Sequence, residues 1–207
     1  MLYENTVAPE TMGLLRELMQ MNELGDFALV GGTNLSLRLG HRISEDIDLF
    51  TNQPYDSDAL THTLQQRYIN DMLVVEKRAY TVLAYIKNIK VDLVLHRYPY
   101  LQPIEVIDGI RFAAVPDIVA MKLNAITRRG AKKDFFDLAD LLDHYTLEEM
   151  LQFFMDKYAN TDIGFVVRSL TYFTEADASK DPISLSLMHW GQVKEKIVGA
   201  VHAYWNT

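Results

Sequence analysis

The chain has 207 residues, a formal net charge of −8 and no cysteine. Hydrophobic residues make up 49% of it, which is enough for a sizeable core. The lack of cysteine excludes disulfides and thiolate zinc sites, and the acidic charge argues against a broad nucleic-acid-binding surface, because such binding needs many Lys and Arg contacts to phosphate. The sequence shows neither a secretion signal nor a long apolar run, so we expect a cytoplasmic protein that does not bind membranes.

The first elements that the sequence predicts are a helix, a short strand and a second helix. Apolar residues recur at helical spacing from Pro9 to Leu24, and Gly25 follows as the expected C-cap. The apolar run from Phe27 to Val30 predicts a buried strand that turns sharply at Gly31-Gly32. A short helix is expected to start at Thr33, although the alternation of its leucines also fits a strand.

The next stretch predicts a strand that carries acids, then a helix, a meander and a hairpin. Ile47 to Phe50 form the strand, and Asp56 caps a helix that reaches Tyr68. The antiparallel meander comprises the β-rich runs 73–78, 81–87 and 90–96. A hairpin with its turn at Asp108-Gly109 joins residues 104–107 to residues 110–113.

After residue 114 the pattern becomes helical. A helix from Pro116 to Arg129 is stopped by Gly130, and further helical runs cover 134–144, 147–158 and the remainder through Trp205. We therefore predict an α+β fold, in which a mixed β-sheet with helices on one side occupies residues 1–114 and a helical region occupies residues 115–207. No linker separates the two parts, so they are expected to pack as one unit.

Two carboxylates on the acidic strand are expected to lie side by side. Because side chains alternate along a strand, Asp46 and Asp48 point the same way, while Ile47 points into the core. Like charges this close repel each other, and a bound cation stabilises both in the ionised form. Carboxylate oxygens suit Mg²⁺ or Mn²⁺. Asp92 lies in an apolar strand, where an ionisable group needs a partner, and it is the candidate third ligand.

The glycine turn before this strand has the properties of a phosphate site. Gly31 and Gly32 let a phosphate approach the backbone, and the free N–H groups at the start of a helix favour an anion. The Thr33 hydroxyl can donate a further hydrogen bond. The spacing matches neither a P-loop nor the glycine fingerprint of a dinucleotide-binding fold.

Each of these features also has a purely structural interpretation. A Gly-Gly pair after a strand is often a plain turn, and an Asp-x-Asp at a strand end is more often solvated than metal-bound. Asp92 could pair with Lys90 or Arg111. The ordered combination is more specific than any one of its parts, and it favours a catalytic site.

Several stretches of the sequence resemble the AbiEii/AbiGii-type nucleotidyltransferase toxins, a family within the DNA polymerase β superfamily. The resemblance begins at Gly31-Gly32-Thr33 and continues through Gly40-His41-Arg42-Ile43-Ser44-Glu45-Asp46-Ile47-Asp48. Met121-Lys122-Leu123 and Lys133-Asp134-Phe135-Phe136-Asp137-Leu138 are similar to the family's later motifs. The resemblance covers residues 27–142 and implies that the mixed sheet is a polymerase β-like nucleotidyltransferase core.

The resemblance implies a role for residues of each motif. These roles are metal ligation by Asp46 and Asp48, nucleotide binding by Gly32 and Thr33, and completion of the active site by Lys122 with Asp134 or Asp137. Thr33 replaces the family's more common serine and keeps the hydroxyl. The chain is shorter than many toxins of this family, so a substrate-binding helical region could be missing.

Cations and loop residues near the motifs are further candidates for nucleotide binding. Lys122 and Arg129 are seven residues apart and share one face of their predicted helix, where they would form part of a positive patch. The alternative is that these cations only complement the negative end of the helix dipole. His41, Arg42 and Ser44 are expected to border the nucleotide site, although a plain loop role explains them equally well.

The main hypothesis is a metal-dependent nucleotidyltransferase. Two divalent ions, Mg²⁺ or Mn²⁺, on Asp46, Asp48 and Asp92 would neutralise charge as an acceptor hydroxyl attacks the α-phosphate of a nucleoside triphosphate. Asp92 is expected to accept the proton or to hold the acceptor's metal. By resemblance, the acceptor is a tRNA 3′ end or a protein hydroxyl, and the chain could be the toxin partner of an antitoxin protein.

Two other classes of protein stay open at this point. A non-catalytic module that binds a nucleotide or pairs with an antitoxin is disfavoured by the intact acids. An Asp-x-Asp glycosyltransferase that uses Mn²⁺ and a sugar nucleotide is disfavoured by the upstream glycine turn.

Overall fold

The centre of the molecule is a mixed β-sheet. A computed structural model describes residues 1–159 and 161–206, and within them the strands form one seven-stranded sheet in the order β3-β4-β5-β2-β1-β7-β6. The strands are β1 (Ala28–Val30), β2 (Ile47–Thr51), β3 (Met72–Arg78), β4 (Thr81–Ile86), β5 (Ile89–Leu95), β6 (Glu105–Ile107) and β7 (Ile110–Phe112). β2 runs parallel to β5 and β1 runs parallel to β7, whereas the other neighbours are antiparallel. The predicted mixed sheet is confirmed.

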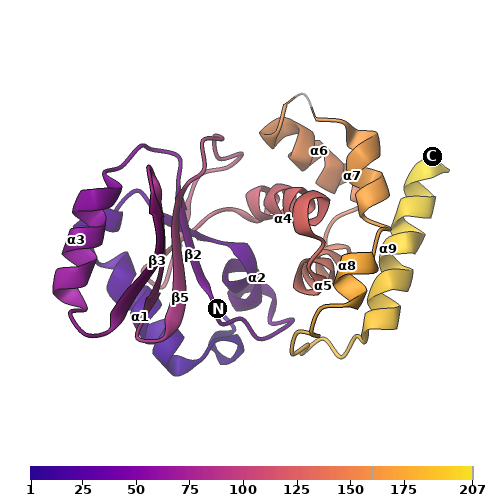
Figure 1. Ribbon diagram of the computed structural model, residues 1–207. Helices are drawn as coiled ribbons and strands as arrows, with labels where there is room; N and C mark the ends of the chain where they lie inside the picture. The colour runs from indigo at the N-terminus through magenta and orange to yellow at the C-terminus, as the bar shows by residue number, and fades with distance from the viewer. Residues whose placement is uncertain (160, 207) are drawn as a thin grey trace.

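Helices cover both faces of this sheet (Figure 1). α1 (Pro9–Met19) and α3 (Ser57–Arg67) pack on one face and share a buried apolar core with it. α2 (Gly31–Leu39) lies on the opposite face, where Leu35 joins a second core. The expectation of helices on one side therefore describes α1 and α3 but not α2, because the chain turns at once from β1 onto the other face.

The ends of the first two helices differ from the prediction. α1 ends at Met19, and a separate 3-10 turn covers Asn22–Leu24, because the intervening Met21 is extended (φ −78°, ψ 129°). α2 begins at Gly31 rather than at Thr33. Gly31 has φ +70°, a left-handed conformation that glycine adopts without a steric penalty, and it makes this immediate turn possible.

The predicted meander and hairpin are confirmed. β3 pairs with β4, and β4 pairs with β5, both antiparallel. Lys87 and Asn88, with φ of 51° and 63°, form the turn between β4 and β5. Asp108 and Gly109 join β6 to β7 with φ of 50° and 78°. Positive φ at both central residues is the mark of a tight hairpin turn, which explains the Asp-Gly pair.

The helical part packs against the face that carries α2. Its helices are α4 (Val115–Arg129), α5 (Lys132–Leu141), α6 (Leu147–Lys157), α7 (Ile163–Ser169), α8 (Thr174–Asp177) and α9 (Trp190–Trp205). The second core contains Val30, Leu35 and Ala113 together with residues of these helices, so the two parts share apolar packing. No helix within residues 1–159 and 161–206 is long and apolar enough to cross a membrane.

The prediction that the whole remainder is helical is wrong for residues 178–189. This segment is extended and crosses back to the amino-terminal part (Figure 1). Its backbone groups bond outside a helix: Ile43 N donates to Ile183 O at 2.9 Å, and Leu185 N donates to His41 O at 2.7 Å. Pro182 cannot donate a helical hydrogen bond, which favours the extended course.

A buried ion pair fixes α6 against α4. Lys157 Nζ donates to Asp117 Oδ1 at 2.6 Å and to Pro99 O at 3.0 Å, and the side chains of Lys157 and Asp117 are both fully buried. Asp117 also accepts from the backbone N–H of Leu101 at 3.0 Å. Removing one partner of such a pair leaves the other charge buried and uncompensated.

We predict that Lys157→Met lowers the free energy of unfolding by about 3–5 kcal/mol at neutral pH, because Asp117 loses its counter-ion. Urea denaturation followed by circular dichroism measures this change. Lys196→Met, which breaks the exposed pair with Asp143, is the matched control and should change stability by less than about 1 kcal/mol. Equal effects of the two variants would contradict the prediction.

Candidate active site

The three candidate carboxylates lie together on one face of the sheet. The parallel register places Asp48 of β2 directly beside Asp92 of β5. Asp46 lies two residues before Asp48 and shares its side of the chain. Burial raises the pKa of Asp48 to about 6, and the neighbouring charges of Asp92 and Asp46 add to this rise. The register of the sheet therefore brings Asp48 and Asp92 side by side.

A lysine holds each of the two outer carboxylates. Lys133 Nζ of α5 donates to Asp46 Oδ2 at 3.1 Å, and Lys90 Nζ donates to Asp92 Oδ2 at 2.7 Å. Burial acts to lower the pKa of Lys90, but the hydrogen bond and charge of Asp92 raise it overall. Arg111, the other partner considered for Asp92, instead donates to three backbone carbonyls near β1.

The carboxylate oxygens of Asp46, Asp48 and Asp92 are suitable ligands for a divalent cation, although their side chains are not arranged around a common point. Within the described ranges 1–159 and 161–206, no group of three or more acidic or histidine side chains is arranged to hold a metal ion. Two features nevertheless fit a cation: Asp92 Oδ1 is buried without a hydrogen-bond partner, and Asp48 lies beside it with a raised pKa. Lys90 and Lys133 each hold one oxygen of these carboxylates, so a bound cation would compete with them for Asp92 and Asp46.

The two glycines of the turn leave room for charged side chains. A Cβ atom at Gly31 would collide with the carboxylate of Asp48, and a Cβ atom at Gly32 would collide with the guanidinium of Arg42. A larger residue at either position would push these groups away from the site. Glycine is therefore needed at these two positions for two reasons. It allows the turn, and it leaves space for the side chains of Asp48 and Arg42.

The Thr33 hydroxyl is used inside the protein. Thr33 is fully buried, its Oγ1 donates to the backbone carbonyl of Asp46, and Ser44 Oγ lies 2.9 Å from it. The structure does not support the predicted contact between this hydroxyl and a phosphate, because its single proton is engaged by the backbone. Thr33 instead holds the segment that enters β2, and so positions Asp46.

Asp137 of α5 is the centre of a buried ionic network. It accepts from Arg42 Nε and Nη2 at 2.6 and 2.9 Å and lies 2.7 Å from His41 Nε2. Lys122 Nζ lies 2.6 Å from its other side. Burial acts to raise the pKa of Asp137, but the charges of Arg42 and Lys122 hold that pKa well below its usual range. Asp137 is therefore ionised and ties the loop after α2 to α4 and α5.

Lys122, Asp134 and Asp137, which were expected to complete the active site, form a buried ionic group close enough for the charge of Lys122 to act on Asp48. Lys122 Nζ donates to Asp134 Oδ1 at 2.8 Å, and both Asp side chains are fully buried. Burial acts to lower the pKa of Lys122, but these two acids raise it, so the ammonium group is satisfied internally. Both Asp134 and Asp137 thus belong to the buried ionic network, and Asp137 positions Arg42.

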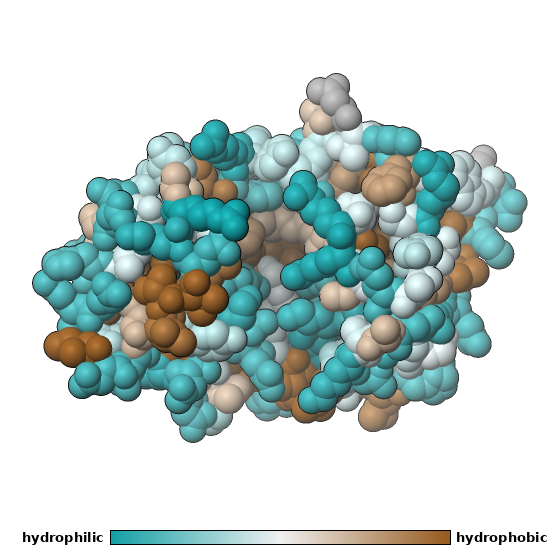
Figure 2. Space-filling view, in the orientation of Figure 1, coloured by the Kyte–Doolittle hydropathy of each residue, from teal (hydrophilic) through white to brown (hydrophobic). Residues whose placement is uncertain are grey.

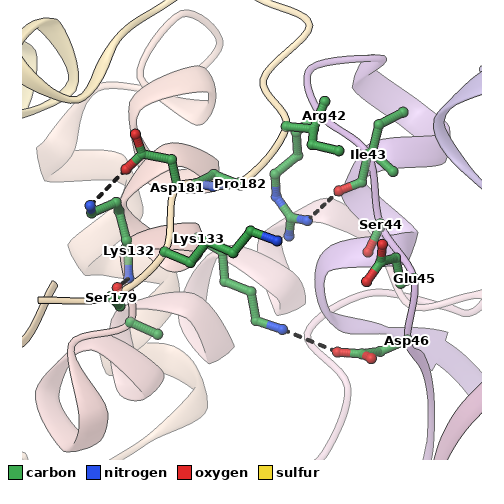
Figure 3. A pocket seen from close by; sticks show the side chains of 13 residues that line it. Arg42, Ile43, Ser44, Glu45, Asp46, Lys132, Lys133, Ser179, Asp181 and Pro182 are labelled. Atoms are coloured by element: carbon green, nitrogen blue, oxygen red, sulfur yellow. Dashed lines mark hydrogen bonds and ion pairs between the residues drawn. The ribbon is translucent and has the colours of Figure 1, made fainter.

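A pocket of about 280 Å³ lies between the amino-terminal and helical parts (Figure 3). It is lined by Arg42–Asp46, Ala131–Lys133 and Ser179–Ile183. Of the residues expected to bind a nucleotide, Arg42 and Ser44 line this pocket. His41 faces Asp137 and does not line the pocket, and Arg129 lines a different groove.

Two parts of the pocket escaped the sequence analysis. Lys132 and Lys133 stand out in the sequence as a basic pair before Asp134, but their spacing does not reveal that Lys133 contacts Asp46 and that Lys132 contacts Asp181. Ser179–Ile183 carries no motif, and its place in the pocket depends on the extended course of residues 178–189.

Comparison with known proteins identifies the family. The model of the family described as "Nucleotidyl transferase AbiEii toxin, Type IV TA system" matches residues 13–205. The chain belongs to this family. As a member of the AbiEii family it is a nucleotidyltransferase, which rules out the glycosyltransferase interpretation. An uncharacterized protein of Aquifex aeolicus is 34% identical to it over 196 residues, covering 92% of this chain and 93% of that protein.

Two solved structures have a similar fold. JHP933 of Helicobacter pylori superimposes with a TM-score of 0.60 at 18% identity and covers 95% of this chain and 92% of its own. MenT4, a nucleotidyltransferase toxin of Mycobacterium tuberculosis, superimposes with a TM-score of 0.56 at 14% identity and covers 94% and 86%. At these identities the likeness establishes the fold of this AbiEii-family enzyme and not its substrate.

The raised pKa of Asp48 predicts a pH-dependent effect of Asp48→Asn. Asp48 is ionised in the folded and the unfolded chain above about pH 6, where its buried charge costs stability, and it is protonated in both well below pH 3.8. In the presence of a chelator, Asp48→Asn should therefore be more stable than wild type by on the order of 1–3 kcal/mol at pH 7.5, with the difference shrinking towards pH 4.

Urea denaturation across this pH range measures the difference between the two proteins. Glu23→Gln, which removes an exposed charge, is the control and should give a small difference that does not depend on pH. A difference between Asp48→Asn and wild type that is constant from pH 4 to pH 7.5 would show that neither burial nor the neighbouring acids raise the pKa of Asp48.

Proposed function

We propose that this AbiEii-family enzyme transfers a nucleoside monophosphate from a nucleoside triphosphate to the 3′ hydroxyl of an RNA, such as a tRNA, and that it is the toxin of a toxin–antitoxin pair acting in the cytoplasm. The observation that carries the proposal is the register of β2 and β5, which sets Asp48 beside Asp92 on the open sheet face. A pocket with cationic walls adjoins Asp46 of the same set.

The acids would hold Mg²⁺ or Mn²⁺, and the family's nucleotide chemistry suits this donor set. When bound, such an ion supplies positive charge that neutralises the phosphate oxygens and the attacking oxygen. Asp46 and Asp48 would hold it towards the nucleotide, and Asp92 would hold it towards the acceptor. The hydroxyl oxygen forms a bond to the α-phosphorus, the bond to the bridging oxygen breaks, pyrophosphate leaves, and Asp92 accepts the hydroxyl proton.

Lys133 would exchange its contact with Asp46 for a contact with a phosphate of the nucleotide. It lines the pocket and holds Asp46 through a single hydrogen bond of 3.1 Å, with 45% of its side chain exposed. A lysine on a flexible stem can exchange one anionic partner for another at little cost. When a cation takes its place on Asp46, the ammonium group of Lys133 is free to contact a phosphate in the pocket.

Arg42 would provide a fixed contact beside this mobile one. Asp137 holds its guanidinium from behind by two hydrogen bonds, and Gly32 leaves space for it at the start of α2. A guanidinium held in this way is placed before the nucleotide arrives, so little entropy is lost when it binds a phosphate. His41 would support Arg42 through Asp137 and would not itself touch the nucleotide.

A groove in the helical part favours RNA over a protein acceptor. It is lined by the end of α4, α7 and the following turn, and it gathers Arg128, Arg129 and Arg168 with Phe165 and Tyr172. The two aromatic side chains are 50% and 61% exposed, which is unusual for rings of this size. Arginines that contact phosphates beside rings on which bases stack are the usual means of holding a single strand.

The groove and the pocket are lined by neighbouring residues of the chain, Gly130 in the groove and Ala131 in the pocket. We expect an RNA end held in the groove to lead towards the acids. The local basic surface also reconciles RNA binding with the acidic net charge of −8, because only a short single-stranded end has to be held. A protein substrate would not require exposed aromatic rings between arginines.

We predict that Asp46→Asn loses more than about 100-fold of the transfer rate, because the site loses one of its anionic metal ligands. The measurement uses each radiolabelled nucleoside triphosphate with total RNA in the presence of Mg²⁺ or Mn²⁺. Glu10→Gln, an exposed acid of α1, is the control and should keep full activity. Label that appears on protein in place of RNA would show that a protein hydroxyl is the acceptor, and wild-type activity of Asp46→Asn would refute the assignment.

We also predict that Arg168→Ala and Tyr172→Ala each raise the KM for RNA by about 5- to 50-fold, through loss of a phosphate contact and of a stacked base. The KM for the nucleoside triphosphate should not change. Arg168→Ala should in addition weaken the dependence of the RNA KM on salt, whereas Arg16→Ala, on the opposite side of the sheet, should not. An unchanged RNA KM in both groove variants would exclude this path.

A further inference from the structure

The extended segment Ser179–Ile183 closes one side of the pocket beside Asp46 (Figure 3). One end is anchored to the amino-terminal part, since the carbonyl of Ile183 accepts from Ile43 N at 2.9 Å. The other end is anchored to α5, since Lys132 Nζ donates to Asp181 Oδ1 at 2.6 Å and Ser179 Oγ lies 3.3 Å from Lys132 N. The segment therefore has a fixed position as a wall of the pocket, although no motif marks it.

The cations of the pocket differ in whether their charge is already balanced. Arg42 is paired with Asp137, Lys132 with Asp181, and Lys133 with Asp46. Lys180 also lines the pocket, its side chain is exposed, and within residues 1–159 and 161–206 it makes no ion pair. The segment thus contributes a positive charge that has no protein counter-ion and stands at the pocket wall.

We propose that Lys180 binds the terminal phosphates of the nucleoside triphosphate and positions the nucleotide for transfer; this inference rests on the proposed function. The α-phosphate has to lie at the acids for the reaction, so the β- and γ-phosphates extend from them into the pocket. The wall across the pocket from Asp46 includes the 179–183 segment. A triphosphate carries its greatest negative charge at its end, where an unpaired ammonium group gains most from it.

This assignment predicts that the effect of removing Lys180 on nucleotide affinity depends on the number of phosphates in the nucleotide. Lys180 would contact groups that a monophosphate lacks, so its removal should weaken the binding of a triphosphate and leave a monophosphate almost unaffected. Lys180 does not touch the α-phosphate, so the KM for the triphosphate should rise more than kcat falls. A merely structural role for the segment would affect all nucleotides alike.

The test is calorimetric titration of the full-length protein with each nucleoside triphosphate in Mg²⁺, and with the monophosphate of the base that binds best. Lys180→Ala should weaken triphosphate binding by about 5- to 50-fold, as expected for one charged contact, and change monophosphate binding by less than about twofold. Lys180→Arg should retain most of the affinity. Lys194→Ala, which removes an exposed lysine paired with Asp177 outside the pocket, should match wild type.

Each remaining outcome overturns the inference. Wild-type affinity of Lys180→Ala for triphosphates, or an equal loss for triphosphate and monophosphate, rejects the role of Lys180 and leaves the proposed function intact. Failure of the wild-type protein to bind any nucleoside triphosphate rejects both proposals. The two failures are therefore distinguished by the wild-type titration alone.

Discussion

The parallel pairing of β2 with β5 forces two carboxylates together, and the rest of the site is arranged around their repulsion. Asp48 and Asp92 are register partners, so backbone hydrogen bonds of the sheet fix their proximity. Because burial and this neighbour raise the pKa of Asp48 to about 6, the arrangement costs stability near neutral pH. The positive charges of Lys90 and Lys122 offset part of this cost, since both lower the pKa of Asp48.

The helical part is attached to this site through charge as well as through apolar packing. Asp137 is buried in the helical part, yet Arg42 and His41, two of its three cationic or imidazole partners, come from the loop that leads to the acidic strand. Loss of this ionic network would leave an unpaired charge in the interior, which is far more costly than loss of an exposed pair. The network therefore keeps the relative position of the acids and the pocket wall within narrow limits, as phosphoryl transfer requires.

An apolar surface patch lies near the hollow between the two parts of the molecule. Figure 2 shows a hollow between the two parts of the molecule, with an apolar patch beside it over the β3 edge, where Leu73 and Val75 are 65% and 60% exposed. Hydrophilic side chains border the hollow on the side of the helical part.

Much of the fold could be predicted because local chemistry decides it. The Asp108-Gly109 hairpin, the Asp56 cap and the stop at Gly130 each follow from a backbone preference that one or two residues express. The grouping of Asp46 and Asp48 follows from the period of a strand. The partnership with Asp92 was expected from its apolar setting, although the parallel register that produces it is a property of the whole sheet.

The parts that the sequence did not reveal depend on contacts between distant segments. Thr33 was expected to face a phosphate, but the approach of the chain before β2 engages its hydroxyl first. Lys122 was expected to complete the active site with Asp134 or Asp137, but the sequence did not show that both acids of α5 pair with it. The extended segment of residues 178–189 is stabilised by backbone bonds to residues 41 and 43, a pairing that no local pattern encodes.

Anomalous diffraction from crystals grown with Mn²⁺ and a non-hydrolysable nucleoside triphosphate would show whether the three acids bind metal. We expect an anomalous peak among the carboxylate oxygens of Asp46, Asp48 and Asp92, with Lys90 and Lys133 displaced from them. A nucleotide bound in the pocket with no peak at these acids, and with both lysines still paired to them, would contradict it.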